Sequence, residues 1–496
     1  MLDDRRAWEI QKLRYLQNTK RPVCGQCLKL GLKCDGYGRE IRFINVSVEP
    51  AKAQAHQHDK GSTQITAPAA LVRSAYAEKY MGMLWSGYLP GSKPFPAHIM
   101  QYTGGGWTNT LPQLCRASPA IQRILLAVSL SAAGRAGNNR WEREEGVRCY
   151  MGSLGEMSAA LSNRTRENIT TLCVVSRLYG LYEVLYSHGA YSSSMDTMLT
   201  FVDVQIFFGQ DDQDRIAQAR NWRNHVNGEL AVVTSQSPET YVSGYLHQLF
   251  VDGRLHLTTS AIQARKKTVL SNPEWKTVPW REIPKTPKDR LIDIFVEIPT
   301  LLENLDIMRG CQETNTRATL QHELFQTCWE LERELINWRI QLGIKDPTYT
   351  LGSSPYSLEH LAACHIMCLY WSLCIILYST LRIVSNNPQT PLPPHTEPRI
   401  YCHRIAEVVS LLLHPLAGGY GVHLTSFPVS AAMMYLNAVD GEMVSEEKRM
   451  IFEAFKVSGH GRTVERFNGS MQHIDAVAHG TAMMGSVCGE SQVVAG

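Results

Sequence analysis

Three of the 13 cysteines of this chain lie within eleven positions near its N-terminus. Cys24, Cys27 and Cys34 form the pattern C-x2-C-x6-C in the segment KRPVCGQCLKLGLKCDGYGREIRF, residues 20–43. Thiolates at this spacing commonly hold zinc, because six residues allow a short helix to return the third thiolate to the ion held by the first two. The pattern predicts metal ligation by these three cysteines. The alternative is three free thiols on a basic surface turn.

The segment around these cysteines is basic, although the whole chain of 496 residues carries a net charge of only +3. It contains two carboxylates, Asp35 and Glu40, and six cationic side chains, which are Lys20, Arg21, Lys29, Lys33, Arg39 and Arg42. Such a compact positive patch is typical of a surface that meets phosphate groups. We therefore expect nucleic-acid contacts from this segment and not from the chain as a whole.

The motif R-P-x-C-x2-C-x6-C-x-G-Y in residues 21–37 resembles the second half of the fungal zinc binuclear cluster, a DNA-binding module of fungal transcription factors. The resemblance implies that Cys24 is a bridging ligand and that Cys27 and Cys34 are terminal ligands of one zinc. It also implies phosphate contacts, which position a protein without specifying sequence, from Arg21, Lys29, Lys33, Arg39 and Arg42. It further implies a nuclear regulator of RNA polymerase II transcription.

The later part of the chain is similar to the helical regulatory domain of the same factors. The similarity is carried by LWSGYLP (84–90), SPAIQRILLAVSLSAAGR (118–135), LYEVLY (181–186), WRNHVNGELAVV (222–233) and residues 249–280. The first cysteine half of the family motif, C-x2-C-R-x-R-K-x-K-C-D, has no counterpart in residues 1–19. That half normally supplies three ligands and the helix that reads bases, so we expect DNA binding by this chain to be weak or non-specific.

We predict that the purified chain binds at most one zinc, and weakly. Three thiolates leave one of the four zinc positions to water, or to His56 or His58 in the following segment. Metal analysis of the purified protein measures this directly, and two tightly held zinc ions per chain would contradict the prediction.

The hydrophobic pattern predicts an all-α fold: an incomplete zinc-cluster segment at 1–43, a flexible linker at 44–70, a large helical regulatory domain at 71–470 and a tail at 471–496. Apolar residues recur at three-four spacing in nine segments, which are 118–136, 144–162, 171–187, 241–264, 287–306, 316–342, 357–384, 397–413 and 445–456. PLPPHTEP and PLAGGYGVH read as loops, and 187–218 as an irregular insertion.

Residues 361–381 contain no Lys, Arg, Asp or Glu and are long enough to span a bilayer. His365 and several hydroxyl groups interrupt the stretch, so we predict a buried central helix at 358–383 and no membrane partner. Cys364, His365 and Cys368 share a helix face, where core packing is a simpler explanation than a metal site. The ten cysteines outside the basic segment are predicted to be free thiols in a reducing compartment.

No spacing typical of a catalytic centre occurs in the chain, and the glycines of YTGGGWTN (102–109) are predicted to form a turn. We therefore expect no enzyme. The alternative to a DNA-binding regulator is a co-regulator or ligand-sensing helical protein that does not contact DNA directly. A homodimer, a small-molecule effector and a protein co-regulator all remain open as partners.

Overall fold

The structure is a computed structural model that describes residues 69–162, 166–186, 212–344, 347–350, 356–385, 391–441 and 443–457. Contacts divide the chain into two compact units, Met1–Glu78 and Lys79–Gly496. The first unit is described only at residues 69–78, and the features discussed below belong to the second. All regular elements in the described ranges are helices, without a strand among them, which confirms the all-α fold class.

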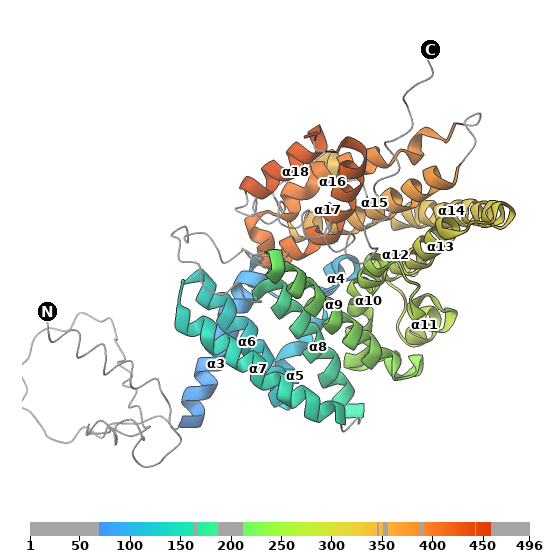
Figure 1. The fold of residues 1–496 in the computed structure, drawn as a ribbon. Helices are drawn as coiled ribbons and strands as arrows, with labels where there is room; N and C mark the ends of the chain where they lie inside the picture. The colour runs from blue at the N-terminus through green and yellow to red at the C-terminus, as the bar shows by residue number, and fades with distance from the viewer. Residues whose placement is uncertain are drawn as a thin grey trace, which may run out of the picture. The chain divides into compact units, whose positions relative to one another are not determined.

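The α-helices of the described ranges follow one another in chain order (Figure 1). They are α3 (Ala69–Tyr88), α4 (Ala97–Thr103), α5 (Trp107–Ala117), α6 (Pro119–Ala136), α7 (Arg140–Ser162), α8 (Arg166–Tyr186), α9 (Asp212–Thr234), α10 (Gly244–Ala264), α11 (Pro273–Thr277), α12 (Pro287–Phe295), α13 (Ile298–Gly310), α14 (Thr314–Leu342), α15 (Leu358–Val384), α16 (Pro398–Leu412), α17 (Gly418–Asp440) and α18 (Glu446–Val457).

Two groups of helices make most of the contacts. In one, α6 packs against α7 and α8, and α8 packs against α9. In the other, α15 packs against α14, α16 and α17. Helix α10 joins the groups, because it contacts α8 and α9 of the first group and also α12 and α13, which contact α14 and α15 of the second. The buried side chains of both groups belong to a single apolar cluster.

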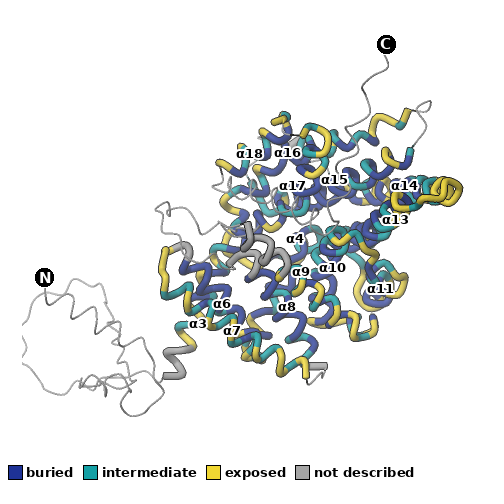
Figure 2. Tube along the Cα trace, viewed as in Figure 1, coloured by how far each residue is buried: buried dark blue, intermediate teal, exposed yellow. Residues whose placement is uncertain are grey.

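Helix α15 is buried along most of its length, as predicted for 358–383 (Figure 2). Its mean hydropathy over 18 residues reaches 1.9, which would suffice for a membrane span, yet 83% of that stretch is buried inside the protein. Its serine hydroxyl groups are satisfied within the helix: Ser372 Oγ donates to the Cys368 carbonyl at 2.7 Å and Ser379 Oγ to the Ile375 carbonyl at 2.6 Å. Ser357 caps its N-terminus by accepting from the His360 N–H.

The segment predicted as one helix over 287–306 is two helices in the structure. Helix α12 ends at Phe295 and α13 begins at Ile298. Pro299 explains the break, because its ring would clash with the carbonyl of the residue four positions earlier, Phe295, and it has no N–H to donate. Thr286 and Asp289 form a capping box at the start of α12.

Two other predictions are wrong in part. Residues 212–218, assigned to an irregular insertion, form the first turns of α9, while 187–211 lie outside the described residues. The loop PLAGGYGVH ends at Ala417, because α17 begins at Gly418. A Cβ atom on Gly421 would lie 2.1 Å from the Leu412 carbonyl oxygen, so the glycine allows α17 to begin against the end of α16.

The nine cysteines in the described part of the chain are all free thiols, and six of them are buried. Cys364, His365 and Cys368 are 0%, 1% and 0% exposed and pack within the core of the helical unit. Core packing of these three side chains is therefore confirmed. Burial raises the pKa of the Cys328 thiol to about 12, which is typical of inert structural cysteines.

Candidate ligand cavity

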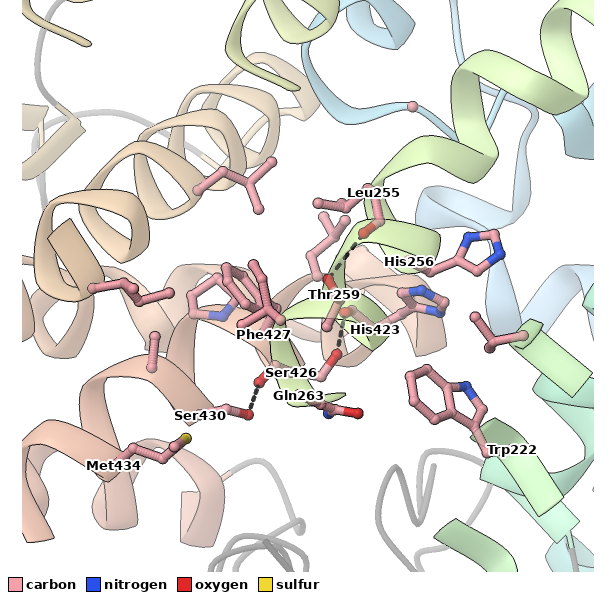
Figure 3. Close-up of a pocket in the computed structure, with 18 of the residues that line it drawn as sticks. Trp222, Leu255, His256, Thr259, Gln263, His423, Ser426, Phe427, Ser430 and Met434 are labelled. Atoms are coloured by element: carbon pink, nitrogen blue, oxygen red, sulfur yellow. Dashed lines mark hydrogen bonds between the residues drawn. The ribbon is translucent and has the colours of Figure 1, made fainter. Parts of the chain in front are cut away.

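A cavity of about 500 Å³ lies inside the helical unit, between α8, α9, α10, α13, α15 and α17 (Figure 3). Its volume is within the range of small-molecule sites. Most of its wall is apolar, and the apolar side chains include Leu255, Ile262, Leu302, Leu305, Leu369, Ile376, Leu424 and Phe427. A wall of this kind is suited to the apolar body of a small ligand.

The cavity reaches solvent between the end of α15 and α17. Ile383 and Met434 line it and are also 43% and 50% exposed. In Figure 3, Met434 lies at one end of the group of labelled side chains and Trp222 at the other. Other lining side chains, including Leu302, Leu305 and Leu369, are buried, so the cavity extends from the surface into the core.

One polar part of the wall is built around a buried ion pair between α10 and α12. Asp252 Oδ1 accepts from Lys288 Nζ at 3.0 Å, and the two side chains are 3% and 5% exposed. Asp252 Oδ2 also accepts from the Trp107 backbone N–H at 2.9 Å and from Gln248 Nε2 at 2.8 Å. Burial alone would raise the pKa of Asp252, but Lys288 and these donors hold it below its usual value.

The triple-glycine sequence forms a turn beside this ion pair, as predicted. Gly104 and Gly105 have φ angles of 78° and 81°, in the left-handed region that favours glycine. A Cβ atom on Gly104 would lie 2.8 Å from Lys288 Nζ, and one on Gly105 would lie 2.8 Å from Tyr420 Oη. The glycines therefore also allow the backbone of this turn to lie close to the polar side chains of the cavity.

A second polar part joins α8, α9 and α10. Arg177 Nη2 donates to Glu229 Oε1 at 2.5 Å, and His256 Nε2 lies 2.9 Å from Glu229 Oε2. Burial would raise the pKa of Glu229, but Arg177 and His256 lower it to about 2. The Nε and Nη1 atoms of Arg177 are buried without a hydrogen-bond partner. These donors remain free on a side chain that lines the cavity.

Two further histidines line the cavity, His365 from α15 and His423 from α17. Burial, followed by the nearby Lys288 and His423, lowers the pKa of His365 to about 3. Burial and then His256 lower the pKa of His423 as well, although the residue as a whole is exposed. Both rings are therefore neutral at pH 7 and add no charge to the cavity.

The site residues predicted from the sequence lie outside the described residues. They are the ligands Cys24, Cys27 and Cys34 and the basic residues Arg21, Lys29, Lys33, Arg39 and Arg42. In the ranges that the structure does describe, no group of three or more His, Cys, Asp or Glu side chains could hold a metal ion. The zinc and DNA sites remain predictions.

The polar residues of the cavity were not predicted from the sequence. A charged residue in a helical segment usually indicates the solvent-exposed face of the helix. This applies to the four charged residues of the cavity, Asp252, Lys288, Arg177 and Glu229. The available signal was LFVDGRLHL (249–257), where Asp252 and Arg254 interrupt an otherwise apolar run. Charges inside such a run are rarely buried unless they are paired, so they indicate an ion pair in the core.

Comparison of the chain with family models, with curated proteins and with solved structures gave no match. The similarity of residues 20–43 to a zinc-cluster half therefore stays a prediction that depends on the motif itself.

Proposed function

We propose that this chain is a transcription regulator of the fungal zinc-cluster type, whose helical part is a receptor for a small effector. The cavity carries the proposal for the helical part, because it combines an apolar wall of small-molecule size with a few buried polar groups. Cys24, Cys27 and Cys34, with the basic residues around them, support the link to DNA. The proposed location is the nucleus, without a membrane partner and without enzymatic activity.

A ligand-sensing co-regulator without direct DNA contact is the second candidate. The cavity favours it, since ligand binding there requires nothing from the cysteine segment. Three thiolates cannot complete a cluster of two zinc ions, so the chain would act through a protein partner or a second copy of itself.

A DNA titration separates the two candidates. We expect the unmodified chain to bind random duplexes and a CGG-type half-site with similar, low affinity and with a steep dependence on salt. The reason is that a few cationic groups can neutralise phosphates, whereas the motif half that reads base edges in the family has no counterpart in residues 1–19. Fluorescence anisotropy at two salt concentrations measures both affinities.

Charge-removing variants supply the control. Lys29→Gln and Lys33→Gln should weaken binding to every duplex and flatten the salt slope, while Lys93→Gln, at an exposed site in the helical unit, should have no effect. A preference of about a hundredfold for the half-site, near the low end of specific recognition, would show that the chain reads bases unaided. No binding to any duplex would favour the co-regulator.

A further inference from the structure

Cationic side chains outnumber carboxylates around the cavity. Five of them line it, which are Arg177, Arg223, Arg265, Lys288 and Arg309. Three are paired, with Glu229, Asp306 and Asp252. Within the described ranges, Arg223 and Arg309 form no ion pair at contact distance; Arg223 is half-buried and Arg309 is exposed to solvent.

The surplus is clearest where α10 ends against α13. Arg265 Nε and Nη2 donate to both carboxylate oxygens of Asp306, each at 2.6 Å. The Asp306 carboxylate is therefore paired with Arg265. Arg309 lies near this Arg265 guanidinium and has no carboxylate of its own at contact distance. Burial and then Arg265 lower the pKa of Arg309, and Asp306 offsets this only in part. An anion at this end of the cavity would relieve the repulsion between the two arginines.

Buried donors without a hydrogen-bond partner also line the cavity. Arg177 has a side chain only 9% exposed, and its Nε and Nη1 atoms have no hydrogen-bond partner. The Nε atom of Arg223 is buried without a partner as well. A buried donor without an acceptor is costly, and a hydrogen bond from a guanidinium to an anionic oxygen is among the strongest available in proteins.

We infer that the cavity binds an amphipathic organic acid, with its apolar body along the α15 and α17 wall and its anionic oxygen group held by the arginines. The inference rests on the proposed role of the cavity as an effector site. A cationic ligand would meet a wall in which cations outnumber carboxylates, and a neutral ligand without an acceptor would leave the buried donors of Arg177 and Arg223 without a partner. The neutral rings of His365 and His423 do not change this balance.

A series of probes with one tail and three head groups tests the inference. Dodecanoate, 1-dodecanol and dodecylamine are each titrated against full-length protein loaded with the neutral dye Nile red, and loss of dye fluorescence reports displacement. We expect dodecanoate to bind at least about tenfold more tightly than the alcohol, which is the effect of one additional charge-assisted contact, and the amine to bind most weakly.

Substitutions of the arginines test where the head group binds. Arg309→Gln and Arg223→Gln should each weaken dodecanoate while leaving the alcohol unchanged. Arg333→Gln, whose side chain on α14 is 72% exposed and does not line the cavity, should change neither. These positions avoid Arg177, whose loss would leave Glu229 buried without its main partner and could unfold the protein.

Substitutions of two threonines test where the tail binds. In both, the hydroxyl group donates to the backbone carbonyl four positions earlier. Thr259 lines the cavity and donates to the carbonyl of Leu255, while the exposed Thr319 on α14 donates to the carbonyl of Asn315. Thr259→Phe should abolish displacement of the dye by dodecanoate, and Thr319→Phe should not.

The outcomes separate the inference from the proposed function. Equal binding of acid and alcohol, or acid binding that is insensitive to both arginine variants, would contradict the inference that the ligand is an organic acid. The proposal that the cavity is an effector site would not be affected. Displacement that survives in Thr259→Phe, or no displacement by any of the three probes, would overturn both. The DNA titration is independent of either result.

Discussion

Replacing Asp252 by alanine is expected to lower the free energy of unfolding by about 3–5 kcal/mol. The carboxylate is buried and accepts from Lys288, from the Trp107 N–H at the start of α5 and from Gln248. Its removal leaves the Lys288 ammonium buried without an anion. It also removes the hydrogen bonds that link α10 to α5 and α12. Urea unfolding at pH 7, followed by circular dichroism, measures the change.

An exposed ion pair provides the control for this variant. Arg140 and Glu144 are paired on the surface of α7 with side chains 65% and 53% exposed, so Glu144→Ala should cost less than about 1 kcal/mol. The double variant Asp252→Asn with Lys288→Met removes both buried charges and should recover much of the loss. The role assigned to the ion pair is wrong if Asp252→Ala costs no more than Glu144→Ala.

Stability should also fall as the pH decreases below about 6.5, and His365 should account for a large part of the fall. The folded protein keeps the His365 pKa at about 3, whereas the unfolded chain has the ordinary value near 6.5. Between these values the unfolded state binds a proton that the folded state does not, so acid favours unfolding. The expected loss is about 1.4 kcal/mol for each pH unit.

The variant His365→Gln tests this origin of the pH dependence. Free energies of unfolding at pH 7 and pH 5 should differ by about 2 kcal/mol less in the variant than in the original chain. The lowered pKa of His423 acts in the same direction and accounts for a remaining slope. Glu229, with its pKa lowered to about 2, loses its contribution only below about pH 4.5, outside this window.

The exposed residue His322 on α14 supplies a matched control, because its ring is hydrated in both states. His322→Gln should leave the dependence on pH as it is in the original chain. An unchanged slope in His365→Gln would show that the acid sensitivity originates elsewhere.

Local sequence patterns predicted the helices that carry a strong local signal. The three-four spacing predicted α6, α7, α14 and α15 closely, and the lack of charge in 361–381 predicted that α15 is buried. Helix α17 was missed as a whole, because none of the predicted segments covers Gly418–Asp440 and the glycines at its beginning usually indicate a turn. At Gly421 the contact with the Leu412 carbonyl, made by another helix, explains the glycine.

The sequence by itself determined the all-α class, the buried central helix and the basic C-x2-C-x6-C segment, because each depends on residues close together in the chain. Only the tertiary structure decided that a cavity exists, that Lys288 pairs with Asp252 from 36 positions away and that Arg177 pairs with Glu229 from 52 positions away. Local periodicity contains no information about such pairs. The surplus of cations and the neutral state of His365 follow from which helices pack together, since desolvation and charge proximity depend on distance in space and not in sequence.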